Sequence, residues 1–296
     1  MIAAWPDPDD IERHAATHGL DEADIVRDIV RIVSIAHLVE RGFLGDDCVL
    51  TGGMALRLRG SPRFTIMDTD SSMRGRLDDV ELARGLAVTE GDDLDIRPDD
   101  GNLWGRATPQ LTIARPIEYD AYFASATGDP VAGLFTFTVN QRGLFRAATW
   151  VGLTHPYPEL EFEARNLRVP LMDITEQAAE KIVGWAANGL AKHYVDLAWI
   201  GREHGAELEK ADFRDLVQRK LDVGYATYPA AYGHLRDIEQ LIPALANPRN
   251  WQGPLNREGD NRGSSIRFMG AGIGFDEAKA LVKLHVVPRL FDVVAH

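Results

Sequence analysis

The sequence of 296 residues contains a single cysteine, Cys48, and no apolar run long enough to span a bilayer. One cysteine excludes an internal disulfide framework and a cysteine-rich zinc module. Because a spanning helix needs about 20 predominantly apolar residues, we expect no membrane partner. The first residues show neither a basic leader nor a long apolar stretch, which predicts a cytoplasmic protein without a targeting segment.

Positive charge is also scarce in this chain. It has 32 basic side chains (Lys and Arg) against 45 acidic ones (Asp and Glu), which gives a formal net charge of -13. Because binding to a polyanion needs clustered positive charge, nonspecific coating of nucleic acid is disfavoured, although a local basic groove is compatible with this balance. The length suits one large domain or two ordinary ones.

The hydrophobic pattern divides the chain into an α/β half and a helical half. Apolar residues recurring every three or four positions predict a helix from Asp21, with a buried stripe of Ile25, Ile29, Ile32, Ala36 and Val39. Short apolar runs predict strands over 48–50, 64–67, 111–113, 117–123, 134–139 and 145–153. Further helices are predicted over 54–59, 78–86, 173–189, 194–203, 212–222 and 275–287.

Polar stretches over 91–106, 154–170 and 243–274 are interpreted as loops, the second of them as a linker. We therefore predict an α/β domain over residues 20–165 with a mixed sheet. A mostly helical C-terminal domain is predicted over residues 166–296.

The most specific local pattern joins a glycine pair to two neighbouring acids. A predicted strand leads into Gly52 and Gly53, a short helix follows, and the next predicted strand runs into Asp68 and Asp70. Glycines let a backbone approach an anion closely because no Cβ intervenes, and a helix start offers unpaired N–H groups to a phosphate. Carboxylates one residue apart on a strand point the same way, and such a pair can hold Mg²⁺ together with substrate phosphates.

This arrangement resembles the nucleotidyltransferase superfamily related to DNA polymerase β, and within it the AbiEii/AbiGii toxin family, which includes the MenT toxins. The family's Gly-Gly-x-x-Leu turn is matched by Gly52, Gly53 and Leu56. Its Arg-x-Ser/Thr-x-Asp-x-Asp motif is matched, with one extra residue before the first acid, by Arg63, Thr65, Asp68 and Asp70.

Two further motifs of the family fall on predicted C-terminal helices. A Gln-x-x-x-Lys motif is matched by Gln177 and Lys181, and a Lys-Asp-x-x-Asp motif by Lys192 and Asp196, with His193 replacing the first acid. On the helix pattern alone, Lys181 suits an ordinary surface lysine equally well. Asp196 lies within an apolar run, where a carboxylate needs a partner, and Lys181 or a substrate hydroxyl are the candidates.

The resemblance implies a polymerase-β-like core and a Mg²⁺-dependent enzyme that transfers a nucleoside monophosphate from a nucleoside triphosphate. The implied acceptor is the 3′ end of tRNA, whose modification blocks translation, and the implied partner is a cognate antitoxin. Metal ligation would fall to Asp68 and Asp70. Triphosphate binding would fall to Gly52, Gly53, Arg63 and Thr65. Lys181 would bind phosphate, and Asp196 would orient Lys181 or deprotonate the acceptor.

Polymerase-β-like enzymes often add a third carboxylate on a later strand, and here residues 149–153 carry none. The role of this third acid or general base remains open. The candidates are a water-mediated base, Asp196, or one of three acids elsewhere, Asp120, Glu159 and Glu161. The missing acid motivates one alternative, a non-catalytic nucleotide-binding module. The other alternative is a nucleotidyltransferase that acts on a small molecule or a protein.

Overall fold

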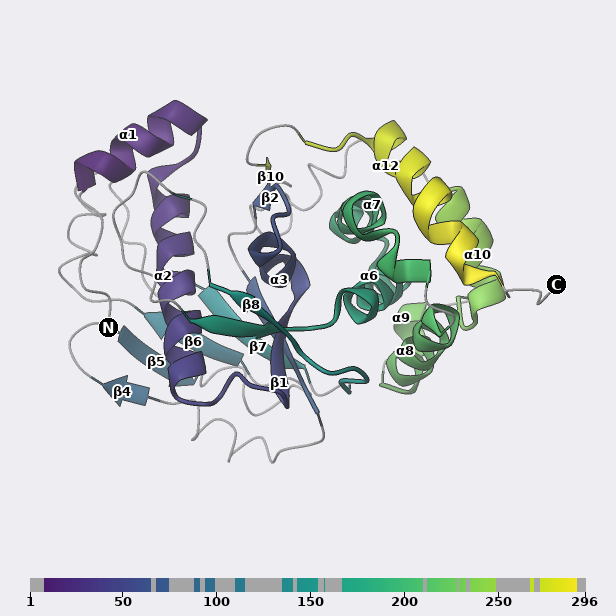
Figure 1. The fold of residues 1–296 in the computed structure, drawn as a ribbon, viewed down its shortest axis with the longest axis horizontal. Helices are drawn as coiled ribbons and strands as arrows, with labels where there is room; N and C mark the ends of the chain where they lie inside the picture. Colours follow the sequence, from purple (N-terminus) through teal and green to yellow (C-terminus); the bar gives the residue numbers. More distant parts are fainter. Residues whose placement is uncertain are drawn as a thin grey trace. The chain divides into compact units, whose positions relative to one another are not determined.

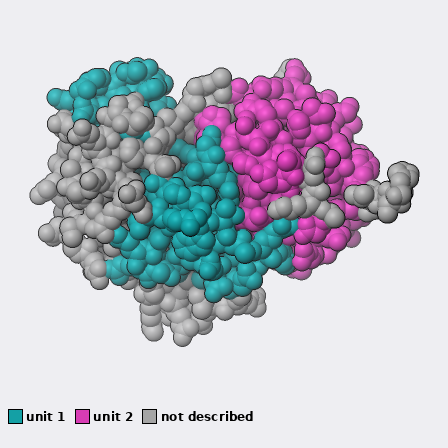
Figure 2. Space-filling view, viewed as in Figure 1, with its two compact units in different colours: residues 1–60, 65–171 teal, residues 61–64, 172–296 magenta. Residues whose placement is uncertain are grey.

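The structure is a computed structural model, and it forms two compact units (Figure 2). Unit 1 comprises Met1–Gly60 and Thr65–Leu171, and unit 2 comprises Ser61–Phe64 and Met172–His296. The residues described are 8–64, 68–74, 88–90, 94–98, 110–114, 135–140, 143–153, 157, 167–209, 212–227, 229–232, 235–248, 267–268 and 272–291. The α/β first half and the largely helical second half confirm the predicted fold class. The predicted division into domains at residues 165 and 166 stays a prediction.

Unit 1 is built on an eight-stranded mixed sheet with the strand order β4-β5-β6-β7-β3-β1-β9-β8 (Figure 1). The strands are β1 (Cys48–Thr51), β3 (Asp68–Met73), β4 (Val88–Glu90), β5 (Leu94–Pro98), β6 (Gln110–Ala114), β7 (Phe135–Asn140), β8 (Thr149–Gly152) and β9 (Arg168–Leu171). Strand β1 is antiparallel to β3 and parallel to β9, and β3 runs parallel to β7. The glycine turn therefore follows β1, which lies next to the acid strand β3 in the centre of the sheet.

The helices of unit 1 are α1 (Pro8–His18), α2 (Glu22–Glu40) and α3 (Gly52–Leu58). Helix α2 confirms the helix predicted from Asp21, and its isoleucines are almost fully buried, as the apolar stripe predicted. Ala36 and Val39 are instead partly exposed. The buried side of α2 also holds Asp28, Arg31 and Ser34, which the apolar pattern did not include.

The placement of the acids corrects one expectation. We predicted a strand over 64–67 that ends at the acids, but β3 begins at Asp68 and extends to Met73. The reason is that the polar segment after the acids pairs on both sides, with β1 and with β7. Ser71 is buried there, and its hydroxyl donates to the Thr138 carbonyl at 3.2 Å, so the polar side chain has a partner. Residues 65–67 lie outside the described part of the chain.

Other expectations for unit 1 meet mixed outcomes. Strands β1, β6, β7 and β8 and helix α3 confirm predicted elements. Strand β5 lies in the predicted loop 91–106, and β9 lies at the end of the predicted linker 154–170. Both expectations were wrong there because strand pairing stabilises segments whose own composition does not favour a strand. The helix predicted over 78–86 and the strand over 117–123 lie outside the described residues.

Unit 2 is mostly helical, with one short antiparallel pair formed by β2 (Arg63–Phe64) and β10 (Arg267–Phe268). Its helical segments are α6 (Ile174–Asn188), α7 (Ala191–His204), η1 (Glu207–Glu209), α8 (Phe213–Thr227), α9 (Pro229–Tyr232), α10 (Ile238–Ala246), α12 (Phe275–Leu281), η2 (Val282–Val286) and η3 (Val287–Leu290). Helix α10 was not predicted. Within the described residues, none of the helices combines the length and the apolar character needed to cross a membrane.

Helix α6 begins and ends where its local sequence predicts. The Asp173 carboxylate accepts hydrogen bonds from the backbone N–H groups of Thr175 and Glu176, at 3.0 and 3.2 Å. Gly189 ends the helix in the left-handed conformation, with φ of 66°. Glu176, in the first turn of α6, has its carboxylate 2.7 Å from Nζ of Lys220 on α8.

Candidate active site

The glycine turn, Gly52–Gly53, lies against the acid strand β3 in unit 1. Thr51, which ends β1, pairs directly with Asp70 in the register of the two strands. Gly52 has φ of +70°, a left-handed conformation that favours glycine. A Cβ added to Gly52 would lie 3.1 Å from Cβ of Asp70 and would overlap its carboxylate. The absence of a side chain at residue 52 is therefore what allows this carboxylate to approach the turn.

The two acids are the first and third residues of β3. Asp70 is partly exposed, and of Asp68 the structure describes only the backbone, which opens the strand. Thr69, between them, is fully buried. Because successive residues of a strand face opposite sides, Thr69 faces the interior while Asp70 lies on the side of the glycine turn.

A third carboxylate is absent from the strand next to the acids. That strand is β7, which places Thr138 opposite Asp70 and contains no Asp or Glu. The strand expected to carry the acid, residues 149–153, forms β8 at the edge of the sheet, where it pairs with β9. Asp120, Glu159 and Glu161, the substitutes considered from the sequence, lie outside the described residues.

The chemistry of these donors suits a hard divalent cation. Magnesium prefers oxygen ligands, keeps several waters, and is usually bound through one or two carboxylates plus substrate phosphates. The acid strand contains Asp68 and Asp70, and the Asp70 carboxylate lies beside Gly52, which has no side chain. Among the residues that the structure describes, no three His, Cys, Asp or Glu side chains gather as a complete metal site. The carboxyl chemistry of Asp68 and Asp70 therefore fits such a cation.

A second group, the Asp196 cluster, consists of Arg63, Lys181 and Asp196 in unit 2. Arg63 grips the carboxylate with two hydrogen bonds, from Nε to Oδ1 at 2.6 Å and from Nη2 to Oδ2 at 3.0 Å. Lys181 Nζ lies 2.7 Å from the same Oδ2. The three residues come from β2, α6 and α7, and all are at least nine-tenths buried. One carboxylate is thus shared by two cationic side chains.

The electrostatics of this cluster bear on the two roles considered for Asp196, which are to orient Lys181 and to accept a proton. Burial alone would raise the pKa of the Asp196 carboxyl, but the charges and hydrogen bonds of Arg63 and Lys181 outweigh it and hold the pKa below its usual value. A carboxylate with a lowered pKa is a weak proton acceptor near neutral pH. The geometry therefore favours Asp196 as the residue that orients Lys181 and Arg63.

His193 packs beside this cluster, where the family pattern has an acid. A Cβ on Gly184 would lie 3.0 Å from Cε1 of the imidazole, so the ring occupies the space that this glycine leaves. Burial and the positive charges of Lys181 and Lys192 lower the pKa of His193 well below its usual value, against the opposing charge of Asp196. A neutral histidine adds no charge to the cluster.

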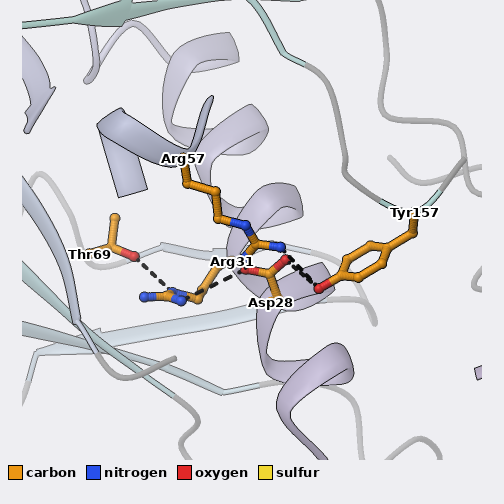
Figure 3. Close-up of polar contacts among 5 residues, drawn as sticks. All are labelled: Asp28, Arg31, Arg57, Thr69 and Tyr157. Atoms are coloured by element: carbon orange, nitrogen blue, oxygen red, sulfur yellow. Dashed lines mark hydrogen bonds and ion pairs between the residues drawn. The ribbon is translucent and has the colours of Figure 1, made fainter. Parts of the chain in front are cut away.

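Sequence reasoning missed a third group, the Asp28 network, which consists of Asp28, Arg31, Arg57, Thr69 and Tyr157 (Figure 3). Asp28 pairs with Arg57 of α3 and accepts a hydrogen bond of 2.7 Å from the Tyr157 hydroxyl. A signal was present, because Asp28 and Arg31 are three residues apart on a helix and flank buried isoleucines. The pair was missed because the buried face of this helix was identified from its apolar residues alone.

The structure thus brings the predicted site residues together in two groups. Gly52 and Asp70 meet in unit 1, and the Asp196 cluster forms in unit 2. Gly53 follows Gly52 in the first turn of α3. Thr65 lies outside the described residues. Arg63, which the sequence grouped with the glycines as a triphosphate ligand, has its guanidinium engaged by Asp196.

Comparison with known proteins gives two kinds of match. The family model for the nucleotidyl transferase AbiEii toxin of type IV toxin–antitoxin systems matches residues 35–264. MenT4, a nucleotidyltransferase toxin from Mycobacterium tuberculosis, superposes with a TM-score of 0.59 at 17% identity, covering 95% of this chain and 87% of its own. At that identity the likeness shows the fold alone.

A candidate nucleotidyltransferase from Helicobacter pylori has a TM-score of 0.48 at 12% identity, covering 92% of this chain and 96% of its own. A search of curated proteins returned no match.

Proposed function

Because this chain belongs to the AbiEii family of nucleotidyltransferase toxins from toxin–antitoxin systems, we propose that it transfers a nucleoside monophosphate from a nucleoside triphosphate to the 3′ end of tRNA. The observation that carries the proposal is the approach of the Asp70 carboxylate to the glycine turn. A cognate antitoxin is the partner that the family implies, and its gene is expected beside that of the toxin.

In this proposal Asp70 and Asp68 hold Mg²⁺, and strand alternation predicts that both carboxylates share one face of β3. A metal bound there supplies charge neutralisation at the transferring phosphoryl group and activates the attacking oxygen. Gly52 and Gly53 allow the triphosphate to approach the backbone, since no Cβ stands in its way. Thr65 is proposed as an additional triphosphate ligand.

The Asp196 cluster is proposed to supply the cationic side chains that bind phosphate. Lys181 and Arg63 bind phosphate oxygens, and Asp196 fixes the direction of both side chains. A lysine and an arginine side by side are the side chains that bind phosphate oxygens by charge and hydrogen bonding. Because the cluster is buried, its interactions are stronger than those of a solvated ion pair.

The proposed step is a substitution at the α-phosphorus. The 3′-hydroxyl oxygen of the acceptor forms a bond to this phosphorus, and the bond from phosphorus to the oxygen that bridges to the β-phosphate breaks. Pyrophosphate leaves with the bonding electrons, and the hydroxyl proton passes to solvent through a water molecule. The lowered pKa of Asp196 argues for this path over direct proton transfer to that carboxylate.

The choice of acceptor rests on the resemblance to the toxin family and on charge. A net charge of -13 disfavours broad contact with a polyanion, so we propose recognition of a short RNA end through local contacts. Modification of the 3′ end of tRNA prevents aminoacylation and thereby stops translation.

The test is a transfer assay with each of the four α-labelled nucleoside triphosphates and Mg²⁺, with total tRNA, a protein mixture and small molecules offered separately. We expect label in tRNA and release of pyrophosphate, and loss of both with Asp68→Ala or Lys181→Ala while the proteins remain folded. Label in protein or in a small molecule would show that tRNA is not the acceptor. Nucleotide binding without pyrophosphate release would indicate a non-catalytic binding module. Full activity in both variants would refute the site assignment.

A further inference from the structure

One buried carboxylate on α2, Asp28, is linked to both elements that form the candidate site of unit 1 (Figure 3). Through Arg57, to which it is paired, it reaches α3, the helix that begins at Gly52. Through Arg31, whose Nη1 lies 3.8 Å from its Oδ1, it reaches β3. Arg31 Nε donates to Oγ1 of Thr69 at 3.1 Å, and Thr69 lies between Asp68 and Asp70 in the sequence.

Tyr157 closes this network on the α3 side. Its hydroxyl donates to Oδ2 of Asp28 at 2.7 Å and accepts from Nη2 of Arg57 at 3.1 Å. Burial and the neighbouring Asp28 charge raise the pKa of Tyr157 well above its usual value, so the hydroxyl keeps the proton that it donates. Both oxygens of the Asp28 carboxylate are therefore engaged by side chains from other elements.

Burial of the charged groups in this network opposes folding, so its presence on a buried helix face needs an explanation other than stability. Asp28 and Arg31 are 0% exposed and Arg57 is 8% exposed, although desolvation of such charges opposes folding. Replacing buried ion pairs with apolar residues of similar volume is often neutral or stabilising. Stability alone therefore does not explain why an apolar helix face carries this group. What the group does provide is directional contacts between α2, α3 and β3.

We infer that Asp28 is a positioning residue for nucleotidyl transfer, because it fixes the glycine turn and the acid strand to one point on α2. The inference rests on the function proposed for Gly52, Asp68 and Asp70. One arm of the network holds the helix that follows the turn, and the other holds the residue between the two acids from the interior side of β3. A shift of either element changes the distance between the turn and the acids.

The first test uses Thr69→Val, which keeps the size of the side chain and removes the hydroxyl that Arg31 binds. Because a misplacement of about 1 Å can cost about 100-fold in rate, we expect kcat to fall by ~10–100-fold with little change in the KM for nucleotide. Asp28→Asn is expected to give at least the same loss. The double variant should lose little more kcat than the single variants, since both substitutions interrupt the link between Asp28 and Thr69 through Arg31.

The second readout is hydrogen exchange of backbone amides, which does not depend on catalysis. Exchange over residues 52–58 and 68–73 should become faster in both variants, while α6 of unit 2 serves as an unchanged internal reference. Ile29→Val is the matched control, since Ile29 lies on the same helix at 0% exposure. It should lower thermal stability without altering kcat or the exchange of β3.

The outcomes separate the inference from the function on which it rests. Normal kcat and normal exchange in folded Thr69→Val would overturn the inference, as would an equal loss of kcat in Ile29→Val. If Asp28→Asn does not fold, the isosteric Thr69→Val carries the test. A wild-type protein that transfers no nucleotide to any acceptor would overturn the proposed function, while the exchange measurement would still show whether Asp28 anchors the two elements.

Discussion

The two candidate site regions of this protein have opposite charge. In unit 1, a carboxylate lies against a glycine turn on an acid strand, so the region attracts a cation. In unit 2, two cationic side chains, Arg63 and Lys181, hold one carboxylate, and we propose that they bind an anion. A divalent cation suits the first kind of group and a phosphate suits the second.

The regions also differ in what builds them. The unit 1 region depends on backbone conformation at Gly52 and on the register that sets Thr51 opposite Asp70. The Asp196 cluster depends on side chains from three separate elements that satisfy one another. Substitutions in the first region should therefore affect activity far more than stability, and substitutions in the second should affect both.

The largest expected effect is that of Asp70→Asn on nucleotidyl transfer. Loss of a metal ligand removes several kcal/mol of transition-state stabilisation, so activity should fall by about three orders of magnitude. The partly exposed side chain keeps its size, so the unfolding temperature should stay nearly unchanged. Label transfer and a thermal melt measure the two quantities. Retained activity would remove Asp70 from the site, and a large loss of stability would remove the contrast between the regions.

Asp196→Asn should lower both the stability and the activity that depend on the Asp196 cluster of unit 2. Two buried cations would lose the charge that compensates them, and breaking a buried ion pair typically costs about 3–5 kcal/mol. Urea unfolding should show this loss, and transfer should also fall because Lys181 is no longer held. Asp70→Asn, measured under the same conditions, is the matched control. A stability change below about 1 kcal/mol would mean that the cluster is weaker than its geometry indicates.

Gly52→Ala should have an intermediate effect. An alanine at a φ of +70° is strained by about 1–3 kcal/mol, and its Cβ would overlap the Asp70 carboxylate. We expect that loss in the free energy of unfolding together with a severe loss of transfer. Gly60→Ala provides a comparison, since its φ is +95° but, among the described residues other than its chain neighbours, no atom lies within 4 Å of the added Cβ. If both variants lose the same activity, displacement of Asp70 is not the cause.

The smallest expected effect concerns His193 and pH. Burial and the neighbouring lysines lower the pKa of His193 well below 6.5 in the folded state, so only the unfolded chain takes up a proton as the pH falls through that value. Stability should therefore be fully present above about pH 6.5 and should decrease toward pH 5, by at most about 1.4 kcal/mol per pH unit. Urea unfolding at several pH values should show a shallower dependence for His193→Asn. An unchanged slope would assign the pH dependence to other groups.

Local patterns could be predicted from the sequence, and contacts between distant residues largely could not. The turn at Gly52, the strand before it and the helix predicted over 173–189 depend on neighbours in sequence, and all three are confirmed. Strand β3 was misplaced because its buried serines do not resemble an apolar strand, and only pairing with β1 and β7 stabilises them.

The site residues illustrate the same limit. Lys181 was considered a partner for Asp196, beside a substrate hydroxyl, because a carboxylate within an apolar run needs a partner, and the two side chains are in contact. The contact between Arg63 and Asp196 joins residues 133 positions apart, and no periodicity indicates it. The Asp28 network was missed because a helix pattern identifies its buried face by apolar residues, and charged residues on that face are recognised only once their partners are known.

The most direct test of the central claim is binding of Mn²⁺, in place of Mg²⁺, to the protein together with a non-hydrolysable nucleoside triphosphate. Electron paramagnetic resonance of the bound ion measures the affinity without turnover. We predict that the wild type binds the ion, that Asp70→Asn weakens its binding at least ~10-fold, and that Lys181→Ala retains it while binding nucleotide less tightly. Equal Mn²⁺ affinity in the wild type and in Asp70→Asn would contradict the account.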